Sequence, residues 1–272
     1  MIQYHGLNFS EVNDPIKTEE TIYNRIKDTE LSVEYVGVPL AYSINTFGVE
    51  KTQSIIDDIN IKNPNKKFFV CQHIHVNRLN FGDNLVFTPH TEESDNYLFI
   101  PHYNPIYDRP PERKKFLDRD FKFSFIGDFG TNKIRETLSV LNTEKTPVMP
   151  TGMWFFSHDS ERQEDLLKTY INVLNRSRIS LCPMGTGPST LRLFESMSVG
   201  AIPVIFNDLK LPKEIKNLVS VMDINEIIKN PASMDKLLEN GENLSKNIYE
   251  AYWKYLSNDN LHKSIIKELN GN

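Results

Sequence analysis

The sequence contains little cysteine, no long apolar run and no excess of basic residues. Its two cysteines, Cys71 and Cys182, lie in apolar segments and cannot form the disulfide framework of a small secreted domain. No stretch approaches the roughly 18 apolar residues of a membrane span, and residues 1–14 lack the features of a secretory signal. These absences predict a cytoplasmic protein without a transmembrane segment, and the alternative is a soluble fragment of a longer protein.

The charge balance argues against nucleic acid as a partner. The 272 residues include 31 Lys and Arg but 36 Asp and Glu, which gives a formal net charge of -5. Such a chain has no basic field that would hold a polyanion by releasing its counterions. The proportion of hydrophobic residues, 39%, is ordinary for a folded protein, and the length suggests about two domains.

Prolines mark a break shortly before the middle of the chain. Pro101, Pro105, Pro110 and Pro111 precede the charged run 112–115, and few regular elements cross such a stretch. We therefore predict a hinge at about residues 101–120, with one α/β domain over residues 1–115 and a second over residues 116–272.

Strands and helices alternate clearly in the second domain. Hydrophobic periodicity predicts strands at 121–126, near 148, and at 179–182, 202–206 and 218–222, and helices at 133–141, 160–175 and 190–199. A helical tail follows over residues 233–269. Repeated alternation of this kind favours a parallel sheet with helices on both faces.

The segment 180–206 joins a strand, a glycine loop, a helix and another strand. Gly185 and Gly187 lack side chains where a ligand would approach the backbone, and Ser189 or Thr190 is expected to cap a helix whose free amides attract anions. A diphosphate suits such a place, although a plain strand-to-helix turn is the alternative.

Two charged side chains share one face of the helix that follows this loop. Arg192 lies in its first turn and Glu195 lies three residues later. The arginine is expected near a phosphate, and the carboxylate is able to accept both hydroxyls of a ribose.

The spacing of these residues resembles the signature of the exostosin-like glycosyltransferases. The pattern consists of Cys-x-Pro-x-Gly, Ser-x-x-Arg-x-x-Glu and Gly-x-Ile-Pro-Val, which correspond here to Cys182, Pro183, Gly185, Ser189, Arg192, Glu195, Gly200, Ile202, Pro203 and Val204. Upstream, the segment 125–135 is similar to the family's Phe-x-Gly strand, loop and arginine, with Gly127 and Arg135. The resemblance covers residues 121–222.

This resemblance implies the GT-B fold, in which two Rossmann-like domains face each other across a cleft. It also implies an inverting transferase that uses neither a bound metal nor another cofactor. Such an enzyme moves a sugar from a nucleotide donor, with a UDP-sugar as the favoured donor, to a hydroxyl of a glycan or glycoconjugate. Residues 116–272 would hold the nucleotide sugar and residues 1–115 the acceptor. A non-catalytic carbohydrate or nucleotide-binding module and a sugar-nucleotide epimerase are the alternatives.

The resemblance also implies roles for individual residues. Glu195 would hold the ribose, Arg192 and Ser189 would lie near the diphosphate or nucleoside, and Gly127 with Arg135 would form the other loop that faces the phosphates. A surface ion pair is the alternative role for Arg135, and a purely structural role is the alternative for Glu195.

An inverting transferase also needs a base that takes the proton of the acceptor hydroxyl. The candidates in the first domain are His73, His75 and Glu92, the last in an acidic loop with Glu93 and Asp95. Because the residues of a strand alternate between its faces, we expect Cys71, His73 and His75 to share a face, and this spacing would permit a metal. A fourth ligand has no candidate, so no metal is predicted, and the alternative for either histidine is a structural hydrogen bond. The oligomeric state stays open.

Overall fold

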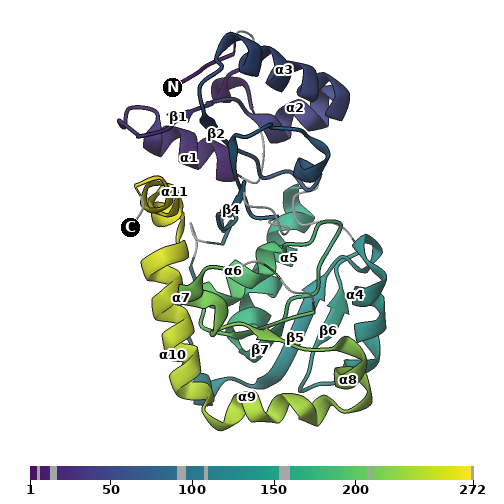
Figure 1. Cartoon of the computed structure of the whole chain (residues 1–272). Coiled ribbons are helices and arrows are strands. Elements are labelled where there is room, and N and C mark those ends of the chain that lie inside the picture. Colours follow the sequence, from purple (N-terminus) through teal and green to yellow (C-terminus); the bar gives the residue numbers. More distant parts are fainter. Residues whose placement is uncertain are drawn as a thin grey trace. The chain divides into compact units, whose positions relative to one another are not determined.

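The computed structural model describes residues 1–4, 7–12, 17–90, 96–106, 110–152, 160–206, 209 and 211–270. It divides into two compact units, shown in Figure 1. Unit 1 comprises Met1–Tyr103 and Tyr255–Asn272, and unit 2 comprises Asn104–Lys254. The division therefore falls after Tyr103, inside the expected hinge and before residue 115. The end of the chain returns to unit 1 because Leu261 and Ile265 are buried in one of its hydrophobic clusters.

Unit 1 is built on a parallel sheet with the strand order β1-β2-β3-β4. The strands are β1 (Glu34–Tyr35), β2 (Lys67–Val70), β3 (Leu85–Thr88) and β4 (Tyr97–Phe99). The helices are α1 (Thr18–Ile26), α2 (Leu40–Phe47), α3 (Val49–Lys62) and α11 (Leu261–Leu269), with short 3-10 turns at Phe9–Glu11, Val76–Arg78 and Asn258–Asn260.

Side chains of β2 alternate between two hydrophobic clusters, one on each face of this sheet. Phe69 is buried in the cluster that includes residues of α2 and α3, and Phe68 is buried in the cluster that includes residues of α1 and α11. Successive strand residues point to opposite faces, so helices on both sides are needed to cover them. Burial of each phenylalanine contributes on the order of 2 kcal/mol.

Unit 2 contains a larger parallel sheet with the strand order β6-β5-β7-β8-β9. The strands are β5 (Phe121–Gly127), β6 (Val148–Pro150), β7 (Ser177–Leu181), β8 (Ile202–Ile205) and β9 (Ser220–Val221). The helices are α4 (Lys133–Thr137), α5 (Ser160–Asn175), α6 (Leu191–Ser198), α7 (Lys213–Lys216), α8 (Ile224–Lys229), α9 (Lys236–Glu239) and α10 (Gly241–Ala251). A π-helical turn, Tyr252–Leu256, follows α10, and 3-10 turns lie at Phe116–Asp118, Phe129–Thr131, Leu138–Leu141 and Pro231–Asp235.

The predicted α/β class is confirmed by these two parallel sheets. Helix α5 has the predicted bounds, and α6 lies within the predicted 190–199. The predicted helix 133–141 differs in its second half, where the chain tightens into a 3-10 turn. Helix α6 gives way to Gly200 with φ of +70°, where an added Cβ would lie 2.9 Å from the carbonyl oxygen of Ser245, so glycine is required there.

The strand order places a topological switch point between β5 and β7. Strand β6 pairs with one side of β5, and the chain then returns to add β7 on the other side. In open parallel sheets, ligands bind where the connections diverge in this way, outside the carboxyl ends of the strands. The carboxyl ends of β5 and β7 are therefore the place in unit 2 where a ligand site is expected.

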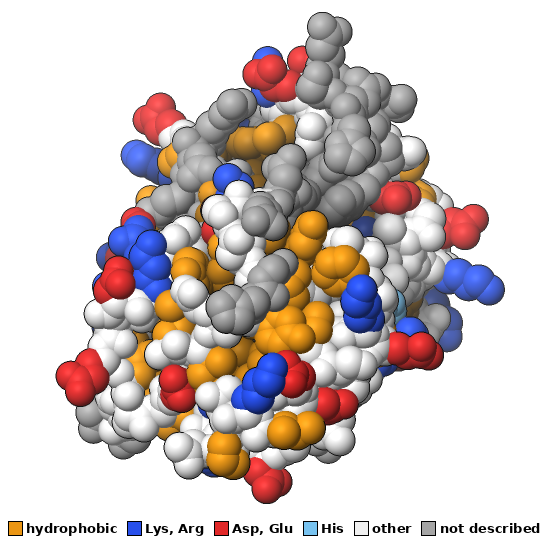
Figure 2. Space-filling model, turned by 90° about the horizontal axis from the view of Figure 1, so that it is seen from above, with side chains coloured by type: hydrophobic (Ala, Val, Ile, Leu, Met, Phe, Trp, Pro, Cys, Tyr) orange, Lys and Arg blue, Asp and Glu red, His pale blue; other side chains and the backbone are white. Residues whose placement is uncertain are grey.

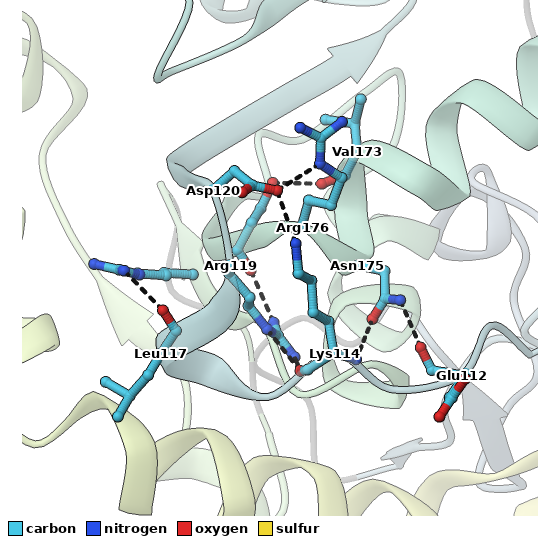
Figure 3. Close-up of polar contacts among 10 residues, drawn as sticks. Glu112, Lys114, Leu117, Arg119, Asp120, Val173, Asn175 and Arg176 are labelled. Atoms are coloured by element: carbon cyan, nitrogen blue, oxygen red, sulfur yellow. Dashed lines mark hydrogen bonds and ion pairs between the residues drawn. The ribbon is translucent and has the colours of Figure 1, made fainter.

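The opposite, amino ends of these strands are closed by a buried arginine, Arg119 (Figure 3). Its Nη1 donates to the carbonyl of Ser177 at 2.8 Å, its Nε and Nη2 donate to the carbonyl of Lys114 at 3.2 and 3.1 Å, and Nη2 also donates to Val199. Burial lowers the pKa of Arg119 to about 9, so the guanidinium stays charged at neutral pH. These bonds join the start of β7 and the end of α6 to the segment before β5.

Two further findings concern the surface. Within the ranges given above, no helix combines the length and the apolar character that crossing a membrane requires. On the face drawn in Figure 2, the described Lys and Arg side chains lie scattered among Asp and Glu, so they form no basic field there.

Candidate functional site

Arg135 connects the loops that follow β5 and β7. It lies on α4, and its Nη1 donates to the carbonyl of Asp128 at 3.1 Å, while its Nε and Nη2 donate to the carbonyls of Met184 and Pro183 at 3.1 and 3.3 Å. Among the described residues it makes no ion pair, so the surface pairing considered for it is absent. Burial and the charge of Arg192 lower the pKa of Arg135 to about 10, and it remains a cation.

Gly185 is fixed by its contact with Arg135. An added Cβ at Gly185 would lie 2.9 Å from Arg135 Nη2, and the Gly185 carbonyl accepts a hydrogen bond of 3.1 Å from Asn132 Nδ2. The absence of a side chain at Gly185 therefore makes room for the guanidinium of Arg135. Gly187 is buried in the bend at residues 186–189.

Arg192 brings a second guanidinium to the end of β5. It donates to the carbonyl of Ile126, and its guanidinium carbon lies 4.5 Å from the ring centroid of Phe125 and 4.8 Å from that of Tyr170. An added Cβ at Gly127 would lie 3.0 Å from Arg192 Nη2, so this glycine admits the second arginine. The structure thus brings together four of the predicted site residues, Gly127, Arg135, Gly185 and Arg192.

The first turn of α6 is not capped in the predicted way. Thr190 occupies the N-cap position with an extended backbone, but its side chain makes no capping hydrogen bond. Ser189 Oγ and Arg192 Nε are buried and have no hydrogen-bond partner within the described part of the chain. A buried polar atom without a partner costs about 1–3 kcal/mol, so both atoms have hydrogen-bonding capacity for a ligand.

Glu195 lies one turn further along α6 and is buried. The hydroxyl of Tyr170, on α5, donates a hydrogen bond to its Oε2. Burial raises the pKa of Glu195, while the Tyr170 hydrogen bond and the charge of Arg192 oppose that increase. Tyr170 therefore contacts both charged residues that the sequence singled out. Sequence reasoning missed it, because an isolated tyrosine in a helix carries no signal of its own.

The electrostatics of this region favour an anion. Arg135 and Arg192 both stack on Phe125, with guanidinium carbons 5.6 and 4.5 Å from its ring centroid. Neither forms an ion pair with a carboxylate among the residues described. Two guanidinium groups beside the amino end of a helix can bind a diphosphate through charge-assisted hydrogen bonds.

The histidine candidates lie in unit 1, after β2. The expectation that Cys71, His73 and His75 share a strand face is wrong, because β2 ends at Val70 and the chain turns at residues 74–75. Nδ1 of His73 accepts a hydrogen bond of 3.0 Å from the backbone N–H of His75. The other ring nitrogen, Nε2, lies 3.0 Å from Oδ1 of Asn45. Because Nδ1 is an acceptor, a neutral His73 carries its proton on Nε2 and donates it to Asn45.

His73 consequently has no free lone pair in this conformation. Burial and the neighbouring His75 lower the pKa of His73 to about 4. His75 is half-buried, its ring centroid lies 5.2 Å from that of His73, and its ring nitrogens have no partner among the described residues. Of the two, His75 therefore fits better the role of a base.

Two more histidines lie nearby and were missed by the sequence analysis. His90 follows β3 and His102 follows β4, and their ring centroids are 5.0 Å apart. Nε2 of His90 lies 3.1 Å from the carbonyl oxygen of Gln72. Burial lowers the pKa of His90 to about 4 and that of His102 well below its usual value, so both are neutral at pH 7. Their positions after consecutive strands were the available signal.

The acidic side chains of unit 1 provide no described candidate for the base. Glu92, Glu93 and Asp95 lie outside the described residues. Glu19 is a buried carboxylate that accepts hydrogen bonds from the backbone N–H groups of Ala41 and Gln72, so it caps the first turn of α2. In the part of the chain that the structure describes, no three His, Cys, Asp or Glu side chains gather as metal ligands would.

Comparison with known protein families gives a match that falls in the second unit. Residues 105–236 match the family model described as the RXYLT1 C-terminal domain, and no curated protein matches the chain. This match confirms the resemblance to the exostosin-like glycosyltransferases.

Several solved structures resemble the chain as well. A GtfA/B complex matches with 12% identity and a TM-score of 0.40, over 80% of this chain and 48% of that one. A mutant of S. aureus TarM in complex with fondaparinux, α-GlcNAc-glycerol and UDP matches with 11% identity and a TM-score of 0.42, over 92% of this chain and 58% of that one. A second TarM structure matches with 13% identity and a TM-score of 0.40, over 92% and 57%. The chain spans about half to three fifths of the length of these proteins.

Proposed function

We propose that the protein binds a UDP-sugar in unit 2 and transfers its sugar to a hydroxyl of a glycan or glycoconjugate, a proposal supported by the match of residues 105–236 to an exostosin-like glycosyltransferase family. The proposal includes inversion at the anomeric carbon and a reaction without a bound metal or cofactor.

The observation that carries the proposal is the pair of buried polar atoms at the start of α6. Ser189 Oγ and Arg192 Nε have no partner among the described residues, and they lie where the connections of β5 and β7 diverge. The guanidinium of Arg135 adds a second positive charge. A diphosphate oxygen would supply acceptors for these donors and would be stabilised by both cations.

The same groups account for the departure of the nucleotide. Negative charge develops on the diphosphate as the bond to the sugar breaks, and fixed cations with a helix amino end stabilise that charge in place of a metal ion. Glu195 would accept the ribose hydroxyls through the carboxylate oxygen that Tyr170 leaves available.

The acceptor hydroxyl must lose its proton as its oxygen attacks the sugar. We assign this step to His75, because both ring nitrogens of His73 are already engaged. His73 would hold the backbone of His75 in place through its Nδ1.

A thermal-shift series tests the donor site. The wild type, Glu195→Ala and Arg178→Met would each be heated with UDP, GDP, ADP, dTDP or CMP, with and without magnesium. Ligand that binds only the folded state raises the melting temperature. We expect a shift with UDP alone that does not depend on magnesium and that Glu195→Ala loses.

Arg178 is the matched control because it has the same local chemistry at the other end of β7. Its guanidinium carbon lies 5.8 Å from the ring centroid of Phe116, its Nη2 donates to the carbonyl of Leu117 at 3.2 Å, and its Nε is buried without a described partner. Arg178→Met should leave the UDP shift unchanged. Absence of a shift with every nucleotide would refute the donor site, and a shift without turnover of any sugar nucleotide would favour a binding module instead.

A further inference from the structure

Tyr170 occupies the position between the two charged residues of α6. Its ring centroid lies 4.8 Å from the guanidinium carbon of Arg192, and its hydroxyl donates to Oε2 of Glu195. The side chain is almost completely buried, with 2% of its surface exposed. One tyrosine from α5 therefore contacts both the cation and the carboxylate of the candidate site.

We propose that Tyr170 is a positioning residue of the donor site, which holds Glu195 ionised and oriented to accept the ribose hydroxyls of the bound nucleotide. This inference rests on the proposed function, because it assigns Tyr170 a role toward the same ligand. It adds a residue that no sequence motif contains.

The hydrogen bond defines what Glu195 is able to do. An ionised carboxylate only accepts hydrogen bonds and has about four acceptor positions, of which the Tyr170 hydroxyl occupies one. A hydrogen bond to the charged form also favours that form. Without the hydroxyl, only the charge of Arg192 would oppose the effect of burial on the carboxyl, and protonation would be favoured. The protonated form would donate a hydrogen bond where the ribose needs an acceptor.

The titratable groups around Glu195 come from three parts of unit 2. Tyr170 lies on α5, Arg192 lies on α6, and the Cys182 thiol follows β7. Burial raises the pKa of Cys182 and of Tyr170, so both are neutral at physiological pH and Arg192 is the charged neighbour. The Tyr170 hydroxyl and the Arg192 charge are thus the two influences that keep Glu195 ionised.

Tyr170→Phe removes the hydroxyl and keeps the ring, so the stacking on Arg192 is retained. We would measure the dissociation constant of UDP by calorimetry between about pH 5 and pH 8 for the wild type, Tyr170→Phe and Glu195→Gln. A hydrogen bond to a charged group contributes about 1.5–3 kcal/mol, which corresponds to roughly one to two pH units. The UDP affinity should fall as the pH is lowered. The pH at the midpoint of this fall should be roughly one to two units higher in Tyr170→Phe than in the wild type.

Two controls separate this effect from titration of the ligand. The terminal phosphate of UDP is expected to titrate near pH 6, as phosphate monoesters do, and this contribution is common to all three proteins. Glu195→Gln should retain only that contribution. The preference for UDP over 2′-deoxy-UDP depends on a ribose hydroxyl bound to the Glu195 carboxylate. As the pH is lowered, this preference should therefore be lost at the pH where Glu195 is protonated.

The outcomes distinguish the inference from the proposed function. If the wild type binds no nucleotide, the donor site is refuted, and the role of Tyr170 with it. If the wild type binds UDP but Tyr170→Phe has the same midpoint, or a uniformly lower affinity at every pH, the inference fails and the donor site stands. Should Tyr170→Phe not fold, Glu195→Gln still decides: an unchanged preference for UDP over 2′-deoxy-UDP in that variant would show that the ribose does not need the carboxylate and would overturn the proposal.

Discussion

The two ends of the sheet in unit 2 each contain a buried arginine, and the two arginines differ in how their donors are used. Arg119, at the amino ends, donates to carbonyls of Lys114, Ser177 and Val199. Arg192, at the carboxyl ends, donates to one carbonyl, stacks on two rings, and has a buried Nε without a described partner. The two arginines are similarly buried, but Arg119 links parts of the fold, whereas Arg192 has a donor available for a ligand.

The histidines of unit 1 repeat this contrast. His73 uses both ring nitrogens within the fold, whereas His75 uses neither among the residues described. In both pairs, one side chain uses its hydrogen-bonding atoms within the fold and stabilises the structure. The other member of the pair has hydrogen-bonding atoms without a described partner, which are available for a ligand.

The largest effect is expected for His75. His75→Ala should reduce sugar transfer by about 10²–10⁴-fold, because a positioned base contributes that much, with UDP affinity unchanged. His73→Asn should reduce transfer less, since it only supports His75. Steady-state kinetics with the donor found by thermal shift measure both, and normal turnover in His75→Ala would direct attention to the acidic loop at Glu92.

Arg119→Met should cost the most stability. Carbonyls of Ser177 and Val199 would lose their buried donor, which lowers the free energy of unfolding by roughly 3–5 kcal/mol. Urea denaturation measures this loss. The UDP affinity of the folded fraction should not change, and a loss below about 1 kcal/mol would show that Arg119 is no structural link.

Arg192→Met should produce the reverse pattern. Loss of a charge-assisted hydrogen bond to a phosphate should weaken UDP binding by roughly 10- to 100-fold, with a smaller loss of stability than in Arg119→Met. Calorimetry of this variant beside Arg178→Met gives the comparison. Equal affinities in the two variants would contradict the assignment of Arg192.

The smallest effect is the pH dependence of the stability of the unliganded protein, and its direction follows from the pKa of Glu195. Burial raises the pKa of Glu195 in the folded state, so its contribution to stability is present below the unfolded pKa and is lost as pH rises through the folded pKa. Glu195→Gln removes this dependence and should be more stable than the wild type at neutral pH. Melting temperatures across a pH series should converge toward acid, and parallel curves would contradict the buried carboxylate.

Much of the fold was predictable because local pattern and tertiary structure agree. The bounds of α5 follow from its hydrophobic periodicity, and the loop before α6 follows from its glycines. The return of α11 to unit 1 could not be predicted, because an amphipathic helix does not specify which surface it covers.

The candidate site was predictable as a set of residues and not as an arrangement. Gly185 was expected where a ligand approaches the backbone, and Gly127 was expected in a loop that faces the phosphates. In the structure an arginine side chain packs against each of them, and this contact depends on how two loops meet in space. The role of Tyr170 depends on the packing of α5 against α6, which no spacing in the sequence encodes.

The central claim is that the free donors at the start of α6 bind the diphosphate of a nucleotide. A crystal structure of the protein with UDP tests it most directly. We predict diphosphate oxygens within hydrogen-bond distance of Ser189 Oγ and Arg192 Nε, with the ribose hydroxyls on Glu195. A diphosphate bound elsewhere, with these two atoms still unpartnered, would contradict the account.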